Sequence, residues 1–321
     1  GHGCCWIKGQ LAGPGTRQFC SNKKNILMNA SFGIDHPLLA THDIDALREL
    51  LISLGFNMTA IGKHPWGTST SLAMFDGCLL EIMGIYDDTL LDKVPAGDFR
   101  FGRHVYEHLN IREGVALSAL HSTNSVEDAK HAEKADLVVA GHLEFGRDVI
   151  LPDGTQGRTK TTLALMPDTN FPRLSFFLCQ QHRPELIYVP EWLEHPNTVN
   201  GICGVNIVAH ERHHAALKTQ LGGLYKSFEV LKGGFQYQTA NGVLRVLNTV
   251  ALENDIGSLT DQVRNEDTPS IAGMDFTTGD LSVLLDYIIK SEVDHCAVEN
   301  GVVLTNQSLT ANTIMRFFER Q

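Results

Sequence analysis

The feature of this chain that most constrains its fold is a pattern of apolar runs and short amphipathic helices that occurs four times. In such a repeat each copy is one structural unit, which buries its hydrophobic face against its neighbours. The clearest copy opens with residues 34–40, continues with a helix that begins at Asp43, and closes with residues 79–84. We predict one strand, one helix and three further strands for each copy, with the inner strands of the first copy at 55–58 and 64–68.

The other three copies follow the same order. Their opening strands are predicted at 115–121, 204–209 and 271–276, and their helices at 125–129 (with Ser125 as the N-cap), 212–221 and 281–291. Their later strands are predicted at 160–165, 174–179, 227–231, 235–239, 243–250, 296–304 and 313–318. Because one small sheet is only marginally stable by itself, we pair the first copy with the second and the third with the fourth. This pairing predicts an α+β fold of repeated βαβββ modules that form cupped mixed β-sheets.

The pairing also divides the chain. We predict a first domain at 29–189, a linker at 190–201, and a second, degenerate domain of the same type at 202–321. Two prolines and the absence of periodicity support the linker. Residues 1–28 show no periodicity either and lack the apolar core of a signal peptide, so we interpret them as an extension outside the fold.

Composition excludes several classes of function. The net charge is −11 and no Lys/Arg patch is evident, which argues against nucleic acid as a partner. No run of 18 apolar residues is present, so no membrane span is predicted. The seven cysteines are scattered without a CxxC pair, which argues against a disulfide framework or a structural zinc motif and favours the cytoplasm.

Several segments carry a resemblance to a known family. They are Asp35-His36 before the helix start at 43–45, the stretch Lys63-His64-Pro65-Trp66-Gly67-Thr68, the tripeptide Leu80-Glu81-Ile82, and residues 176–185 and 195–197. With these segments the chain resembles the vicinal oxygen chelate superfamily, and within it the glyoxalase-like domain proteins. The resemblance implies a cleft in a cupped sheet, where a divalent metal often chelates two adjacent oxygens of a substrate. Members of the superfamily differ in activity, so the fold does not define the function.

His36 and Glu81 are the first two predicted metal ligands. An imidazole suits Zn, Ni, Mn or Fe, and a carboxylate inside an apolar strand needs a partner. The alternatives are that Asp35 merely caps His36 and that Glu81 pairs with a nearby Arg or Lys.

The resemblance implies further ligands at the equivalent positions of the second copy. There the position of His36 falls near Val115 or Ala116, which have no donor atom, and that of Glu81 falls near 179–181. Alternation along a strand favours Gln180 and His182 as metal ligands, with His121 in reserve, although both fit equally well as polar residues of a strand end. In the third copy Val246 falls at the position of Glu81, so we interpret the third and fourth copies as a structural half.

Other predicted site residues lie close by in the sequence. We predict that Glu81 and His64 act as catalytic groups by proton transfer. Substrate contacts are predicted for four further residues, Trp66, Gly67, Thr68 and Phe177. Gly67 would let the backbone approach a ligand closely, and the alternative for this stretch is a well-packed loop anchored by Trp66.

The sequence favours a metal-dependent enzyme that acts on a small oxygenated molecule. Lyase or isomerase chemistry ranks above ring-cleaving oxygenation, because an oxygenase needs two histidines with one carboxylate and only His36 is evident. The competing hypothesis is a metal-free protein that binds or sequesters a small molecule. Subunit pairing in the resembled family makes a homodimer a further prediction.

Overall fold

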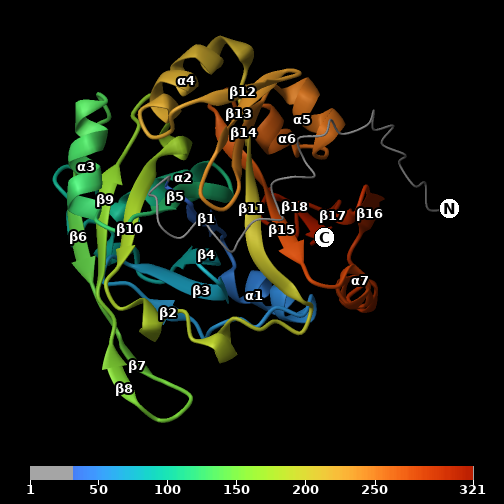
Figure 1. Cartoon of the computed structure of the whole chain (residues 1–321), viewed down its shortest axis with the longest axis horizontal. Coiled ribbons are helices and arrows are strands. Elements are labelled where there is room, and N and C mark those ends of the chain that lie inside the picture. Colours follow the sequence, from blue (N-terminus) through green and yellow to red (C-terminus); the bar gives the residue numbers. More distant parts are fainter. Residues whose placement is uncertain (1–31, 321) are drawn as a thin grey trace.

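The computed structural model describes residues 32–320, so the predicted extension at 1–28 lies outside the described residues (Figure 1). Two eight-stranded sheets form the fold, each built from two βαβββ modules. The first module comprises β1 (Ile34–Ala40), α1 (Ile44–Ser53), β2 (Gly62–Lys63), β3 (Thr68–Phe75) and β4 (Cys78–Ile85). The second comprises β5 (Gly114–His121), α3 (Ser125–Lys134), β6 (Gly141–Phe145), β9 (Thr161–Met166) and β10 (Phe176–Gln181). We call these two modules the first half.

The second half repeats this plan. Its third module comprises β11 (Val199–Val208), α4 (His214–Gly222), β12 (Phe228–Leu231), β13 (Gly234–Gln238) and β14 (Val243–Leu247). Its fourth comprises β15 (Ser270–Thr278), α7 (Leu281–Lys290), β16 (His295–Val298), β17 (Gly301–Leu304) and β18 (Ile314–Glu319). The predicted α+β fold of paired βαβββ modules is therefore confirmed.

The strand order shows how two modules share one sheet. In the first half the order is β2-β3-β4-β1-β5-β10-β9-β6, and the second half has the corresponding order β12-β13-β14-β11-β15-β18-β17-β16. The opening strands β1 and β5 meet antiparallel in the middle, and each also pairs in parallel with the last strand of its own module. Side chains from both modules thus meet at the centre of the sheet.

Two segments of the first copy differ from the prediction. Residues 55–58 are not a strand, although Met58 forms an isolated bridge with Ala73. Gly55, with φ +86°, ends α1 in a left-handed conformation that turns the chain away. Residues 64–67 form the turn between β2 and β3, where Gly67 also has a positive φ. In the second copy Asn124, and not Ser125, is the N-cap of α3.

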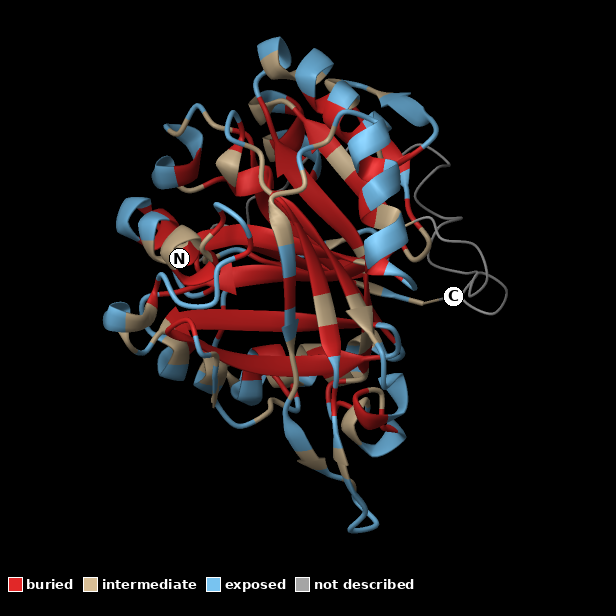
Figure 2. Cartoon of the chain, turned by 90° about the vertical axis from the view of Figure 1, so that its left-hand side faces the viewer, coloured by how far each residue is buried: buried red, intermediate tan, exposed pale blue. Residues whose placement is uncertain are grey.

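The two halves share one hydrophobic core. We call the sheet face that packs on the helices α1, α3, α4 and α7 the helix face, and the opposite face the inner face. Helix-face residues of both sheets form one apolar cluster, in which the ring of Phe56 lies within 6.5 Å of Phe75 and within 6.3 Å of Phe276 and Phe317. Figure 2 shows buried strands beneath helices that are exposed on their outer sides. The division into two domains stays a prediction.

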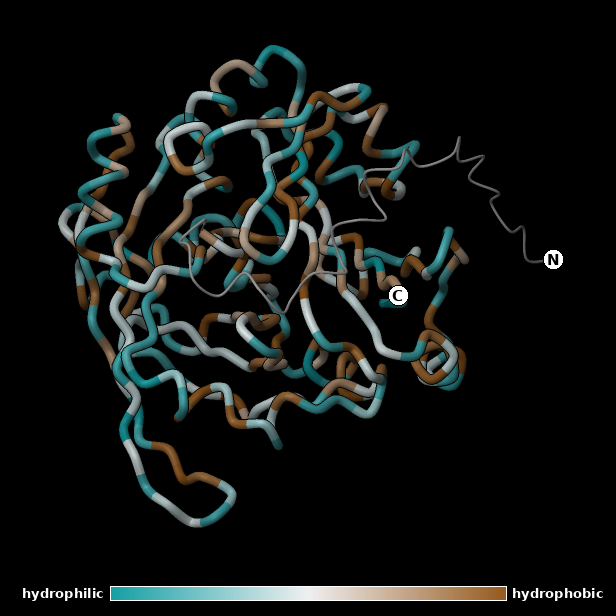
Figure 3. Tube along the Cα trace, viewed as in Figure 1, coloured by the Kyte–Doolittle hydropathy of each residue, from teal (hydrophilic) through white to brown (hydrophobic). Residues whose placement is uncertain are grey.

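The inner faces are covered by the segments that join the modules. In the first half α2 (Phe101–Ile111) packs over the sheet, and in the second half α5 (Thr249–Asp255) and α6 (Asp261–Arg264) do so. A separate hairpin of β7 (Asp148–Ile150) and β8 (Gln156–Arg158) extends away from the body and carries a hydrophobic stretch (Figure 3). Ile150, the last residue of β7, is exposed. Within residues 32–320 no helix has the length and apolar character needed to cross a membrane.

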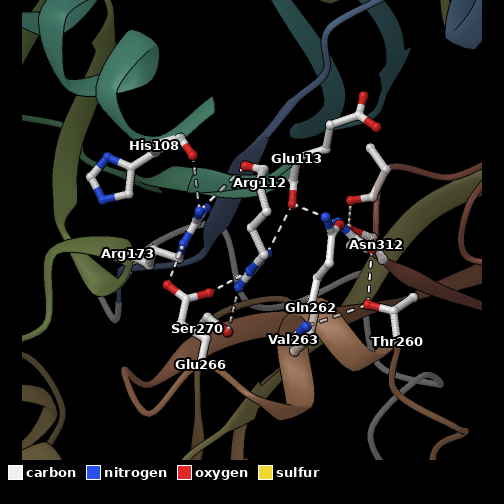
Figure 4. Close-up of polar contacts among 12 residues, drawn as sticks. His108, Arg112, Glu113, Arg173, Thr260, Gln262, Val263, Glu266, Ser270 and Asn312 are labelled. Carbon is white, nitrogen blue, oxygen red and sulfur yellow. Dashed lines mark hydrogen bonds and ion pairs between the residues drawn. The ribbon is translucent and has the colours of Figure 1, made fainter. Parts of the chain in front are cut away.

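A buried network of ion pairs and hydrogen bonds connects the end of α2 to the second half (Figure 4). Arg112, which follows α2, and Arg173 both pair with the carboxylate of Glu266. Arg173 also donates to the carbonyl oxygens of His108 and Arg112, at 3.1 and 3.3 Å. Burial and the charge of Arg112 lower the pKa of Arg173 to about 10. One carboxylate from the second half therefore compensates two buried cations of the first.

Candidate functional site

His36 lies at the centre of a chain of buried charged groups on the first sheet. Its Nδ1 lies 2.5 Å from Oδ1 of Asp35, and its Nε2 lies 3.1 Å from Oε2 of Glu81. Thr70 on β3 donates to the other oxygen of Glu81 at 2.6 Å. These residues meet because β3, β4 and β1 are adjacent strands, in which Glu81 lies opposite Leu72 on one side and Leu38 on the other.

The chain of charges lies between two apolar clusters on the same inner face. One cluster includes Leu38, Met83 and Phe177 together with α2. The other consists of Leu72, Met74, Leu79 and Ile187, and Tyr188 packs against it. Side-chain alternation places His36, Thr70 and Glu81 between them. His36 and Glu81 are only 7% and 6% exposed, so the polar groups are largely shielded from water.

The surroundings determine the protonation states. Burial alone lowers the pKa of His36, but the hydrogen bonds and charges of Asp35 and Glu81 outweigh it and raise this pKa to about 10. Burial opposes ionisation of the two carboxyl groups, but His121 and His36 lower the pKa of Asp35, and His36 with His64 and Thr70 lowers that of Glu81. At neutral pH an imidazolium is therefore held between two carboxylates.

The turn at 64–68 brings further predicted residues to this place. His64 bonds through Nδ1 to Oγ1 of Thr68 at 2.8 Å, and its ring stacks on the buried Trp66 with centroids 4.8 Å apart. Burial lowers the pKa of His64, against the opposing charge of Glu81, so the imidazole is neutral at pH 7. His64 is thus a neutral imidazole near a charged pair, which suits proton transfer.

Gly67 has a structural explanation. A Cβ atom there would lie 2.2 Å from the carbonyl oxygen of Asp87, so the close approach at Gly67 is made by this chain's own backbone. The glycine at this position is therefore explained without a ligand, and its predicted contact with a substrate stays a prediction. Phe177 does lie at the site, edge-on to His36 with centroids 5.8 Å apart.

Strand register shows which residues of the second module match His36 and Glu81. Ala40 lies three residues before the helix cap Asp43 and pairs with Met83 on β4. In the second module His121 lies three residues before the cap Asn124 and pairs with Cys179 on β10. Counting back along each strand places Phe177 at the position of Glu81 and Leu117 at that of His36. Both are buried apolar residues in the cluster below α2.

The structure does not bring Gln180 and His182 to His36, which corrects their predicted place in one ligand set. Gln180 accepts hydrogen bonds from the backbone and hydroxyl of Ser125 at the start of α3, on the helix face. His182 bonds to Thr162 at 2.9 Å, beyond the end of β10. The prediction matched Glu81 with residues 179–181, whereas the strand pairing matches it with Phe177. A shift of one residue along a strand moves a side chain to the other face of the sheet.

The donor set does not fit a tightly held metal ion. The 3.1 Å between Nε2 of His36 and Oε2 of Glu81 suits two adjacent ligands, and a carboxylate on Nδ1 is a common support for a ligating histidine. However, Leu117 and Phe177 supply no third or fourth donor. Among residues 32–320 no group of three or more His, Cys, Asp and Glu side chains is arranged to hold an ion.

Three polar side chains lie at the site although the sequence pattern does not single them out as site residues. Thr70 binds Glu81, and its alternation with Thr68 along β3 was the available signal. Tyr188 lies in an irregular segment that no periodicity marks. Its buried hydroxyl has no hydrogen-bond partner among residues 32–320, and burial with the charge of Asp35 raises its pKa. The reserve candidate His121 places Nδ1 3.5 Å from Oδ2 of Asp35.

The comparisons with known proteins agree with this architecture. The family described as glyoxalase-like domain matches residues 34–221, more than half of the chain. A hypothetical protein from Staphylococcus aureus is similar in structure, with 10% identity, a TM-score of 0.63, and coverage of 90% of this chain and 99% of that one. A mutant of 4-hydroxymandelate synthase from Streptomyces coelicolor shares 12% identity at a TM-score of 0.53, with coverage of 90% and 93%.

These two likenesses show the fold alone, because the identities are so low. No curated protein matches the chain. The family match, however, extends over β1 to α4 and includes the segments that hold His36, His64 and Glu81. The resemblance to the vicinal oxygen chelate superfamily is thus confirmed, and the chain belongs to the glyoxalase-like domain family.

Proposed function

We propose that the inner face of the first sheet binds a small oxygenated molecule and that Glu81 and His36 form an acid–base pair in an isomerase or lyase reaction. The observation that supports this proposal is the buried chain of charged groups Asp35–His36–Glu81 between two apolar clusters. Buried charged groups lower the stability of a protein unless they are paired. Titratable groups whose pKa values are shifted by burial and by a charged partner are typical of functional sites.

The proposed reaction is proton transfer next to a carbonyl group. A carbonyl oxygen that accepts a hydrogen bond from Nε2 of His36 would replace Oε2 of Glu81 as the partner of the imidazolium. The freed carboxylate then takes a proton from the carbon beside the carbonyl, and the electron pair of the C–H bond forms a C=C bond while the π electron pair of the carbonyl moves to its oxygen. His36 stabilises this oxygen as its charge develops, which is most effective in a shielded site. In an α-hydroxy ketone the hydroxyl group on the carbon that lost the proton gives its own proton to the enolate oxygen, and return of the first proton from Glu81 to the former carbonyl carbon completes an isomerisation.

The other site residues have supporting roles in this proposal. Asp35 and Thr70 orient His36 and Glu81 through their hydrogen bonds. The neutral imidazole of His64 passes the hydroxyl proton of the substrate to the enolate oxygen. Phe177 and Trp66 provide apolar contacts for the carbon skeleton.

Solvent-deuterium exchange tests the proposal without knowledge of the product. The purified protein is incubated in D2O with a panel of small α-hydroxy ketones, and NMR follows deuterium at the α-carbon. We expect exchange for at least one compound, and a loss of about 10²- to 10⁴-fold in Glu81→Gln, the usual contribution of a general base. Glu144→Gln, at an exposed carboxylate near Lys160, is the matched control. Equal exchange by Glu81→Gln and the unmodified protein contradicts the proposal.

A second candidate is a metal-free protein that binds or sequesters its ligand. The apolar Phe177 beside His36, at a position where the resemblance implies a ligand, favours it. Binding of a panel compound without any exchange in D2O would support this reading over catalysis.

Metal dependence stays a prediction, and elemental analysis of the purified protein beside His36→Ala tests it. An ion would have to displace a proton from His36, whose pKa the two neighbouring carboxylates raise, and Leu117 and Phe177 of the second module offer no further donor. We therefore expect no stoichiometric Zn, Ni, Mn or Fe. A stoichiometric ion that is lost in His36→Ala would restore the metal-dependent enzyme as the leading function.

A further inference from the structure

Asp35 lies at an irregularity in the pairing of β1 with β5. Ile34 pairs with Leu120 and His36 pairs with Ala119, so Asp35 is an extra residue without a partner of its own on β5. In a regular strand the side chains of Asp35 and His36 would point to opposite faces. The bulge re-aims Asp35, and its Oδ1 lies 2.5 Å from Nδ1 of His36. The support that His36 receives therefore depends on how this carboxylate is held.

The second oxygen of Asp35 faces His121, the last residue of β5. Nδ1 of His121 lies 3.5 Å from Oδ2 of Asp35. Neither of these two buried atoms has a hydrogen bond to any of residues 32–320, so each has the other as its polar partner in this part of the chain. Because a buried carboxylate oxygen without a partner is costly, this ion pair stabilises the observed orientation of Asp35.

The charges of the site also favour this pair. Asp35 and Glu81 are two buried carboxylates, and His36 between them supplies one positive charge. A protonated His121 supplies a second charge, which balances the set. The side chain of His121 is 43% exposed, whereas none of the other three exceeds 9%, so its charge keeps part of its hydration. Pairing with Asp35 raises the pKa of His121, although burial opposes this.

The second half repeats the bulge with other residues. On β11 the extra residue is Cys203, between Ile202 and Gly204. Four positions can therefore be compared, and the second half carries Cys203, Gly204, Thr277 and Arg245 in place of Asp35, His36, His121 and Glu81. This pairing also corrects the prediction that Val246 matches Glu81. The backbone does not itself require acidic and imidazole side chains at these positions.

The polar residues of the second half form a different network. Asp275 pairs there with Arg316 and Arg245, and Asn206 donates to its carboxylate at 3.0 Å. Guanidinium and amide groups thus balance the carboxylate of the second half. The imidazoles and carboxylates of the first half therefore belong to its own site and not to the architecture that the two halves share.

We propose that His121 is a positioning residue of the first-half site, which holds the carboxylate of Asp35 and, through it, the imidazole of His36. This inference rests on the proposed acid–base function of His36 and Glu81, and it extends that machinery to β5. An imidazole that is fixed through Nδ1 presents Nε2 in one orientation, toward Glu81 or toward a substrate carbonyl. His121 itself contacts no substrate.

The variant His121→Phe tests this role by deuterium exchange of an α-hydroxy ketone in D2O. We expect kcat to fall about tenfold with an unchanged KM, because the acid–base pair loses its orientation while the substrate contacts remain. His121→Asn, whose amide nitrogen replaces Nδ1, should recover part of the loss. His142→Phe removes an exposed histidine of β6 and is the matched control. If circular dichroism shows that His121→Phe does not fold, His121→Thr replaces it, since threonine occupies the matching position of the second half.

Proton NMR gives a readout that does not depend on turnover. The proton in the 2.5 Å contact between Nδ1 of His36 and Oδ1 of Asp35 should resonate far downfield, and its loss in His36→Gln identifies it. We expect this signal in the unmodified protein and in His142→Phe. In His121→Phe it should shift or disappear, because Asp35 is no longer held.

The outcomes separate this inference from the proposed function. Exchange that falls in Glu81→Gln but not in His121→Phe overturns the inference and leaves the proposed function standing. A raised KM with unchanged kcat in His121→Phe also overturns it, because His121 would then contact the substrate. If no compound exchanges, the proposed function fails and the proton signal decides the inference alone. A signal that is absent from the unmodified protein, or unchanged in His121→Phe, overturns it in either case.

Discussion

Replacing Glu266 by Gln tests how the two halves are held together. The side chains of Arg112 and Arg173 are only 2% and 1% exposed, and both pair with this carboxylate, which is 16% exposed. Glu266→Gln preserves the shape but leaves two buried guanidinium groups without a counter-charge. One nitrogen of Arg173, Nη1, has no hydrogen-bond partner in the described part of the chain, so these residues supply no spare acceptor.

The expected cost follows from this burial. Removing one partner of a buried ion pair costs about 3–5 kcal/mol. The glutamine oxygen can still accept one of the two hydrogen bonds, and Glu266 is partly exposed, so we expect the lower end, about 3 kcal/mol.

Urea unfolding followed by circular dichroism measures this change. Because the two halves share one apolar cluster, we expect a lower midpoint with an unchanged denaturant slope. Glu185→Gln, which breaks the exposed pair with Arg183, is the matched control and should cost less than about 1 kcal/mol. The double variant Arg173→Met with Glu266→Gln should cost less than the sum of the single changes, because the second change removes one unpaired cation.

Two results would refute this reasoning. One is a Glu266→Gln variant whose free energy of unfolding lies within about 1 kcal/mol of the unmodified protein, since the carboxylate would then not compensate both arginines. The other is strict additivity in the double variant, which would mean that Arg173 and Glu266 act independently.

Two further predictions concern the first half. The folded-state pKa of His36 lies above its ordinary value, at about 10, so its contribution to stability is complete below about pH 6.5 and is lost as the pH rises through 10. The stability difference between the unmodified protein and His36→Gln should therefore shrink from pH 7 to pH 10 in urea titrations, and a constant difference would contradict the charged pair. Gly67→Ala should destabilise the protein by several kcal/mol, because its Cβ would collide with the Asp87 carbonyl at a positive φ, whereas Gly77→Ala, also at positive φ but with open space around it, should cost only about 1 kcal/mol. Equal melting temperatures for the two glycine variants would remove the steric argument.

The candidate site was predictable where its signals were local. His36 and Glu81 were identified because polar residues in apolar strands stand out, and the family segments around them strengthened the assignment. Gln180 and His182 were placed at the same site by counting along strands, without knowledge of which residues pair. The observed pairing of His121 with Cys179 puts Phe177 there instead. In the third module the same uncertainty of one residue separated Val246 from Arg245, and with it an apolar position from a buried charge.

The repeated strands and helices could be predicted from the sequence, because alternating and helical periodicity and N-caps such as Asp43 and Asp280 act within a few residues of the chain. The sequence also predicted the pairing of modules, since one small sheet cannot bury its own face. Which side chains meet across strands and between halves follows from the packing of the folded chain. Arg112 and Glu266 are 154 residues apart, and the network around Asp275 joins four strands. Such contacts depend on register and packing, in which a displacement of one residue exchanges the faces of a strand, and no local pattern encodes that choice.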